Sequence, residues 1–209
     1  MKEEYLDQSE FTYIMWLYKV FEKVQHVPGH IVEVGVAEGR NSIIFGRLIE
    51  AYRQENVRNY YGFDTFSGFT DEDLENNSYL PKNRYDHLSL NFVKKRIQDQ
   101  NLTHICQFIE GDIRKTANEF IASSKYYVRS PGYLRIALLY IDCNAYGASL
   151  ESMRLFKNHM MPGGIICIDE KKQGGETEAL IQFCSENNLK IMRDVGPFSI
   201  PAYTTIDHQ

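Results

Sequence analysis

Apolar residues near the start of the chain recur at spacings of three and four positions. They are Phe11, Ile14, Met15, Tyr18, Phe21 and Val24. This period predicts an amphipathic helix over about residues 9–25, which packs either on its own sheet or on a partner subunit. Pro28 and Gly29 predict that the helix ends before them.

Short apolar runs alternate with helix-length segments through the rest of the chain. The run from His30 to Gly35 is β-branched and ends in glycine, which is typical of a buried strand. Further strands are expected at 60–63, 105–109, 134–141, 165–168, 190–193 and 199–205, and helices at 42–55, 88–98, 116–127, 150–159 and 176–187. Strands separated by helices predict right-handed crossovers. We therefore expect an α/β fold with one doubly wound, mainly parallel seven-stranded sheet, helices on both faces, and a single domain over residues 1–209.

The segment 65–87 has no clear period and is rich in polar residues, glycine and proline. A loop of this length inside a compact domain is usually functional or disordered, so we expect a lid or substrate loop. Its aromatic residues either line a pocket for a sugar or aromatic ring or anchor the loop to the domain. These residues are Phe66, Phe69, Tyr79 and Tyr85.

Composition narrows the class of partner. The 209 residues include 23 Lys and Arg against 28 Asp and Glu, a net charge of −5, and the basic residues are scattered. Binding to nucleic acid or to an anionic membrane normally uses a basic patch, so neither partner is expected. The sequence shows no stretch approaching the roughly 20 apolar residues of a membrane span and no signal-peptide pattern, so the expected location is cytoplasmic.

The segment Glu33-Val34-Gly35-Val36-Ala37-Glu38-Gly39 joins the first strand to a helix. Glycines there let the backbone approach a ligand closely, and the helix start offers free N–H groups. The glycine spacing differs from the dinucleotide and P-loop motifs, which disfavours both of those classes. Glu33, in an otherwise apolar strand, needs a partner, and a positively charged ligand group would serve.

Two further acids follow successive strands. Asp64 ends the second strand, where an acid can accept hydrogen bonds from both ribose hydroxyls of an adenosine. Asp112 comes just after the third strand, where it could reach an adenine amino group. Each acid could instead be a solvated loop residue or a helix cap. Together with Glu33, they favour an adenosyl ligand.

The next two strands end in three more acids, Asp142, Asp169 and Glu170. If these strands are neighbours, about 4.8 Å apart, the carboxylates converge and suit Mg²⁺ or another hard divalent ion. Alternatively, Asp169 and Glu170 cap the next helix and pair with Lys171 and Lys172.

Five ordered segments carry a resemblance to a known family. They are VPGHIVEVGVAEGRNS, YGFDTFSGF, EGDIRKT, LLYIDCNAYGAS and MMPGGIICIDE, within about residues 27–170. In these segments the chain resembles the macrocin O-methyltransferase (TylF-type) family of class I S-adenosylmethionine-dependent methyltransferases. The resemblance implies a Rossmann-like fold, S-adenosylmethionine and Mg²⁺ as cofactors, and an enzyme that methylates a hydroxyl of a sugar or related natural product. It also implies a possible homodimer.

By position, the resemblance implies a cofactor site made of Glu33, Gly35, Gly39, Ser42, Asp64 and Asp112. It implies metal ligands at Asp142, Asp169 and Glu170, with Asp142 also the general base. The family usually has aspartate where this chain has Asn144 and Glu170.

A divalent ion on two vicinal hydroxyls would lower the pKa of the acceptor and leave Asp142 to take its proton. His87, at the end of the 65–87 loop, could assist that deprotonation. Two alternatives stay open. One is a methyltransferase with a phenol, carboxylate or nitrogen acceptor, and the other is a catalytically silent domain that binds S-adenosylmethionine.

Overall fold

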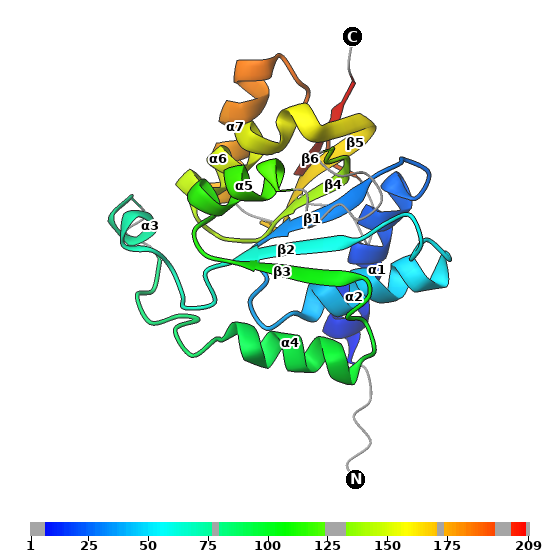
Figure 1. Cartoon of the computed structure of the whole chain (residues 1–209). Helices are drawn as coiled ribbons and strands as arrows, with labels where there is room; N and C mark the ends of the chain where they lie inside the picture. Colours follow the sequence, from blue (N-terminus) through cyan, green and yellow to red (C-terminus); the bar gives the residue numbers. More distant parts are fainter. Residues whose placement is uncertain (1–6, 77–79, 124–132, 171–173, 195–201, 208–209) are drawn as a thin grey trace.

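A computed structural model describes residues 7–76, 80–123, 133–170, 174–194 and 202–207. One sheet has the strand order β3-β2-β1-β4-β5-β6 (Figure 1). The strands are β1 (His30–Val34), β2 (Tyr60–Asp64), β3 (Cys106–Glu110), β4 (Ile136–Ile141), β5 (Met160–Ile168) and β6 (Ala202–Ile206). Strands β1 to β5 are parallel, and β6 runs antiparallel to β5. The order reverses between β1 and β4, which confirms the doubly wound α/β prediction.

Helices cover both faces of this sheet (Figure 1). They are α1 (Gln8–Val24), α2 (Arg40–Ala51), α3 (Asp71–Asn76), α4 (Leu90–Asp99), α5 (Ile113–Ala122), α6 (Tyr146–Phe156) and α7 (Gly175–Asn187), with the 3-10 turn η2 (Lys157–His159) after α6. Helix α5 begins at Ile113 rather than at the expected Thr116. The reason is Asp112, whose side chain accepts a hydrogen bond from the Arg114 N–H and caps the helix.

The sheet has six strands in the described ranges, not the expected seven. The segment expected as a strand at 190–193 forms only a single bridge, between Met192 and Tyr203. Of this segment only Met192 packs against the core, so a longer strand there would have no apolar face to bury. Some of the predictions fall outside the described residues. These are the helix end at 124–127, the strand start at 199–201, and the roles given to Tyr79, Lys171 and Lys172.

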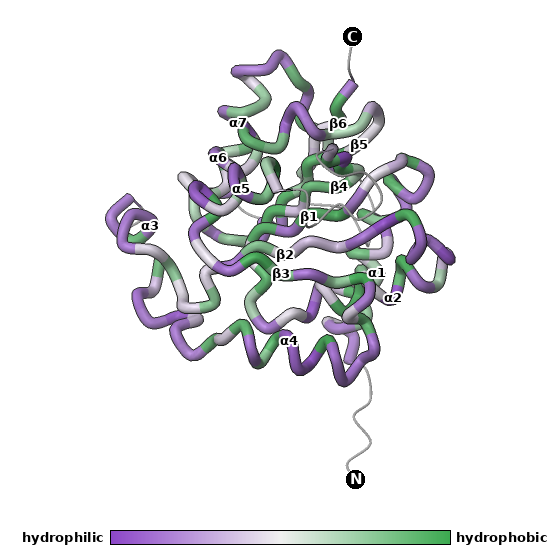
Figure 2. Tube along the Cα trace, viewed as in Figure 1, coloured by the Kyte–Doolittle hydropathy of each residue, from purple (hydrophilic) through white to green (hydrophobic). Residues whose placement is uncertain are grey.

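Two hydrophobic clusters fill the two sides of the sheet. One contains Trp16, Phe45 and Ile97, from α1, α2 and α4, and the other contains residues of α5, α6 and α7. Every residue of β4 is buried, and Figure 2 shows hydrophobic residues along the central strands and hydrophilic ones in α3. The helix predicted at 9–25 therefore packs on its own sheet. None of the helices in the described part of the chain is long and apolar enough to cross a membrane.

His30 begins β1 and is largely enclosed. Its ring Nδ1 accepts a hydrogen bond from the Asn59 backbone N–H at 3.0 Å, so this nitrogen carries no proton. Burial, helped by the nearby positive charge of Arg58, lowers the pKa of His30 from 6.5 to about 4.

We expect the protein to lose stability in mild acid because of His30. As the pH falls, the His30 side chain takes up its proton in the unfolded state before it does so in the folded state, because its pKa is lower in the folded protein. The free energy of unfolding is therefore unaffected by His30 above pH 6.5 and decreases as the pH falls to about 4. The loss should be on the order of 2–3 kcal/mol in the free energy of unfolding. Denaturant titrations between pH 7 and pH 4 on the wild type and His30→Gln measure it. The variant should show a shallower pH dependence, whereas His104→Gln, an exposed histidine, should match the wild type. Equal slopes for all three proteins would contradict the assignment.

Candidate active site

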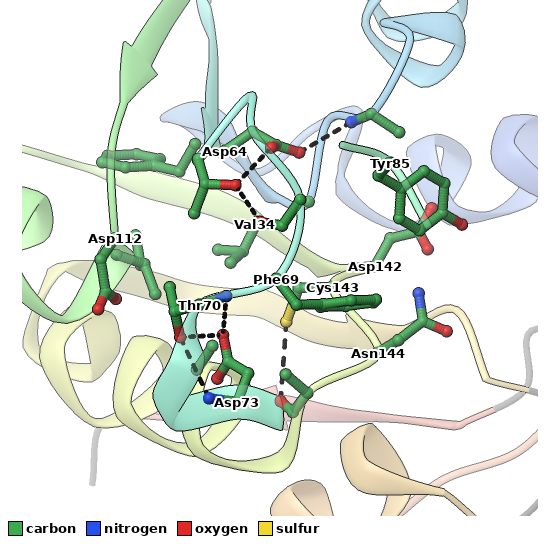
Figure 3. Close-up of a pocket in the computed structure, with 18 of the residues that line it drawn as sticks. Val34, Asp64, Phe69, Thr70, Asp73, Tyr85, Asp112, Asp142, Cys143 and Asn144 are labelled. Carbon is green, nitrogen blue, oxygen red and sulfur yellow. Dashed lines mark hydrogen bonds between the residues drawn. The ribbon is translucent and has the colours of Figure 1, made fainter. Parts of the chain in front are cut away.

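A pocket opens at the carboxyl ends of β1 to β4, next to the segments 65–76 and 80–89, the first of which contains α3 (Figure 3). Among the residues that line it are Gly35, Asp64, Tyr85, Asp112, Asp142 and Asn144. The pocket lies where the strand order reverses, the position at which open α/β sheets bind their ligands. Four of the predicted site residues, Gly35, Asp64, Asp112 and Asp142, therefore line one cavity.

Gly35 is where β1 and β4 come closest at this edge. Its φ is +92°, and a Cβ there would lie 2.0 Å from the backbone oxygen of Asp142. No side chain can occupy that space, so glycine is required for the two strand ends to approach. Gly39, also expected in the site, begins α2 in the left-handed conformation and packs against Val93 instead of lining the pocket.

Asp64 connects the tip of β2 to the turn after β1. Its carboxylate accepts hydrogen bonds from the N–H groups of Val36 at 2.8 Å, Ala37 at 2.9 Å and Phe66 at 2.7 Å. The side chain thus fixes the turn between β1 and α2 and lies at the pocket wall (Figure 3). Its contact with ribose hydroxyls stays a prediction.

Asp112 is a helix cap that also lines the pocket. Its carboxylate caps α5 by accepting the Arg114 N–H at 3.0 Å, and it also accepts the Arg114 Nε–H at 3.1 Å. It lines the pocket next to Gly111 and Ile113. The expected contact with adenine stays a prediction, made by a carboxylate that is already oriented.

Glu33 and Ser42, both expected in the cofactor site, are fully buried and do not line the pocket. Glu33 is fully buried, and its carboxyl accepts hydrogen bonds from the Asn41 amide at 2.7 Å and from the Tyr60 hydroxyl. Ser42 donates to the same Tyr60 hydroxyl at 2.8 Å. Burial raises the pKa of Glu33 well above its usual range. Neutral partners therefore compensate this acid, in the place of the positive ligand group expected from the sequence.

Asn41, which the sequence analysis missed, joins Glu33 to the pocket. Its amide donates to Asp142 at 3.2 Å as well as to Glu33, while its carbonyl oxygen accepts from the Tyr13 hydroxyl at 2.8 Å. Tyr13 brings α1 into this network. Asn41 and Tyr13 have ordinary helical positions in the sequence, so no local pattern distinguishes them.

Asp142 and Asp169 follow the paired strands β4 and β5. The register pairs Ile141 with Ile168, so the two acids are adjacent across the sheet edge. Burial raises the pKa of Asp142 well above its usual range, and the negative charges of Asp169 and Glu176 raise it further. Asp169 accepts a hydrogen bond from the Tyr140 hydroxyl at 2.7 Å. The structure thus brings together two of the three predicted metal ligands.

Glu170 is turned away from that pair. Its carboxylate accepts the Thr177 N–H at 3.0 Å, in the first turn of α7, which is the helix-capping role considered as the alternative. Among the residues that the structure describes, no three His, Cys, Asp or Glu side chains are arranged to hold a metal ion. The predicted set of Asp142, Asp169 and Glu170 is therefore not assembled as a three-carboxylate site.

Glu176, another residue the sequence analysis missed, organises the tips of β4 and β5. Its carboxyl is buried and accepts the N–H groups of Asn144 at 2.7 Å and of Asp169 and Glu170, both at 3.2 Å. Desolvation raises the pKa of Glu176 to about 8, and the nearby charges of Glu170 and Asp169 add to the shift. In the sequence, an acid just after Gly174 and Gly175 is typical of a helix start, so nothing there distinguishes Glu176 from an ordinary first-turn residue.

His87 does not reach the pocket, contrary to expectation. Its side chain is 67% exposed and lies 4.0 Å from a Glu38 carboxylate oxygen and 3.9 Å from one of Asp86. Tyr85 and Leu88 from the same stretch line the pocket instead. His87 is therefore placed on the outside of the loop, away from Asp142.

The aromatic residues of the loop divide between the two roles considered for them. Phe69 and Tyr85 line the pocket, with their ring centroids 5.9 Å apart in an edge-to-face contact. Phe66 is buried in the core and anchors the loop. Figure 3 shows Tyr85 on the same side of the view as Asp142 and Asn144.

A doubly wound sheet with a pocket at its switch point defines the class of open α/β proteins that bind a ligand at the carboxyl ends of their strands. A family model described as a methyltransferase domain matches residues 32–170, and the chain belongs to this family. The protein is thus an enzyme of the methyltransferase class. No curated protein matches the sequence.

Solved structures share the fold at low sequence identity. The calicheamicin methyltransferase CalS11 superposes with a TM-score of 0.79 at 23% identity, over 96% of this chain and 80% of that one. The O-methyltransferase NovP gives 0.72 at 17%, over 94% and 80%. TomG from Streptomyces achromogenes, solved with S-adenosylmethionine, gives 0.55 at 12%, over 97% and 82%. The more specific macrocin-type assignment stays a prediction.

We expect Glu176→Ala to destabilise the protein by about 2 kcal/mol or more. The substitution leaves the N–H groups of Asn144 and Glu170 without their acceptor, at about 1–3 kcal/mol each when buried, whereas the Asp169 N–H keeps its bond to the Ile141 backbone oxygen at 2.9 Å. Chemical denaturation measures the loss. Glu178→Ala is the matched control, because Glu178 is also in the first turn of α7 but is exposed. Equal losses in the two variants would contradict the role given to Glu176.

Proposed function

We propose that this enzyme transfers a methyl group from S-adenosylmethionine to a hydroxyl group of a small molecule, a sugar or sugar-containing natural product. The observation that carries the proposal is Asp142, whose carboxylate lies in the pocket wall and is held there by Asn41. Other parts of the same pocket suit a nucleoside cofactor.

The donor set fits S-adenosylmethionine. Asp64 and Asp112, at the tips of the neighbouring strands β2 and β3, are acceptors suited to ribose hydroxyls and an adenine amino group. Gly35 and Gly111 expose backbone in the wall, and no side chain fits at Gly35. When bound, the cofactor supplies an electrophilic methyl group on a sulfonium.

Asp142 is the group in this pocket suited to remove the acceptor proton. A neutral alcohol is a poor nucleophile near pH 7, and a general base works best when its pKa lies near the working pH. Burial and Asp169 raise the pKa of Asp142 in that direction. The Asn41 amide, 3.2 Å away, orients the carboxylate. Phe69 and Tyr85 offer apolar faces against which an acceptor ring can pack.

Metal assistance is a separate part of the proposal. The resemblance implies Mg²⁺, but Glu170 is committed to the start of α7, and the three acids do not fit as one ligand set. No step is therefore assigned to a metal. Two similar structures support the hydroxyl acceptor: CalS11 is described as a TDP-rhamnose 3'-O-methyltransferase and NovP as an O-methyltransferase.

Two substitutions separate cofactor binding from chemistry. Asp64→Asn should weaken S-adenosylhomocysteine binding at least about tenfold, because it removes a charged acceptor. Asp142→Asn should keep the Kd within about twofold and lower kcat by about 10²–10⁴, the usual contribution of a general base. Isothermal titration gives the Kd, and transfer of labelled methyl to a panel of sugars and nucleotide sugars gives kcat.

Asp99→Asn, on the exposed face of α4, is the control and should change neither quantity. Absence of S-adenosylhomocysteine binding by the wild type would overturn the proposal. Binding without transfer to any hydroxyl would favour a silent domain, and transfer to a phenol, carboxylate or amine alone would favour another acceptor. Parallel assays with Mg²⁺ and with a chelator test the metal: loss of turnover on chelation, with restoration by Mg²⁺, supports metal assistance.

A further inference from the structure

Arg114, in the first turn of α5, connects three parts of the pocket wall. Its guanidinium donates from Nη1 to the Asp73 carboxylate at 2.8 Å, from Nη2 to the Thr70 hydroxyl at 2.8 Å and from Nε to the Asp112 carboxylate at 3.1 Å. The side chain is only 14% exposed. Thr70, Asp73 and Asp112 all line the pocket (Figure 3). One side chain outside the pocket lining therefore fixes three side chains within it.

The segment that Arg114 holds is weakly attached by other means. Thr70 and Asp73 cap α3 reciprocally: the Thr70 hydroxyl donates to Asp73 at 2.7 Å and accepts the Asp73 N–H at 3.1 Å. Helix α3 has six residues, most of them exposed, with Leu74 its hydrophobic contact with the core. A segment with so little apolar burial is among the first to open. The guanidinium thus supplies much of what holds α3 against the domain.

Charge and shape both favour arginine here. The guanidinium is close to three carboxylates, those of Asp73, Asp112 and Glu72, the last at 3.5 Å. Without the guanidinium, these negative charges would repel one another in a part-buried wall. Gly147 at the start of α6 lies beside the guanidinium, since a Cβ there would contact Nη1 at 3.4 Å. The planar fork spans separate acceptors, which a lysine ammonium, as a compact point charge, cannot do.

We propose that Arg114 is a positioning residue that latches α3 to the start of α5 and so sets the affinity of the pocket for its nucleoside cofactor. The inference rests on the proposed function, because it takes the Asp112 end of the pocket as the adenine end. Asp142 follows β4 and has no hydrogen bond or ion pair with Arg114 among the described residues. Loss of the latch should therefore weaken cofactor binding more than it slows methyl transfer at saturating cofactor.

Arg114→Ala should raise the Kd for S-adenosylhomocysteine and the KM for S-adenosylmethionine by about 10- to 100-fold, the range for lost charge-assisted hydrogen bonds. The kcat at saturating S-adenosylmethionine should stay within about threefold. Amide hydrogen exchange over residues 70–76 should become faster, and Arg114→Lys should recover only a small part of the affinity. Asp73→Asn breaks the latch from the α3 side and should weaken binding in the same direction, which keeps the test decisive if Arg114→Ala does not fold.

Arg154→Ala is the matched control, because Arg154 pairs with Glu186 in an exposed contact between α6 and α7. It should leave Kd, KM and exchange over 70–76 unchanged. Unaltered S-adenosylhomocysteine binding by folded Arg114→Ala or Asp73→Asn would overturn the latch and leave the proposed function standing. Full recovery by Arg114→Lys would likewise overturn it, in favour of a simple charge effect. No binding by the wild type would overturn the proposed function, and the latch with it.

Discussion

The close approach of β1 and β4 at their carboxyl ends is the constraint on which the site depends. The two strands are neighbours in the sheet. The chain continues from β1 toward β2 and β3 at one edge, and from β4 toward β5 and β6 at the other edge. At Gly35 the backbone of one strand end lies against the backbone of Asp142 on the other, in a space where no side chain fits. This contact places Asp142 beside the first turn of α2, where Asn41 joins it to the buried Glu33. The pocket and its acids follow from that one close contact.

The acids at this edge are stabilised mainly by backbone and neutral donors. Asp64 takes three N–H groups from the turns around it, and Glu176 takes three from the ends of β4 and β5. Hydrogen bonds to a charged acceptor are stronger than those between neutral groups, so each acid fixes its loop firmly. Asp142 differs from them: among the described residues, its carboxylate accepts a single hydrogen bond, from the Asn41 amide at 3.2 Å. Asp142 also lines the pocket, where a proton acceptor for a bound hydroxyl would be needed.

Most of the helices and strands and the doubly wound arrangement could be predicted from the sequence because they follow from local patterns. The run at His30 to Gly35 and the repeated alternation of strand and helix define the doubly wound sheet, and acids after strands identify Asp64, Asp112 and Asp142 as pocket residues. Side-chain direction could not be predicted in the same way. Glu170 and Glu176 both lie near the start of α7, and only the packing of that helix decides that one caps it and the other binds the strand tips.

Contacts between distant loops are the other part that sequence reasoning missed. Arg114 belongs to the same motif as Asp112, yet its partners Thr70 and Asp73 lie more than 40 positions earlier, in a loop without a clear period. His87 belongs to the same loop, and its side chain was expected in the pocket. Instead it is exposed, and the side chains of Tyr85 and Leu88 line the pocket. The two ends of the pocket thus have different physical characters. A guanidinium faces the acids at the Asp112 end, while at the Asp142 end burial and the neighbouring carboxylates raise the pKa of Asp142. Under the proposed function this difference suits the two ends to different tasks, because a fixed wall would hold a cofactor in place and an acid with a raised pKa would accept a proton.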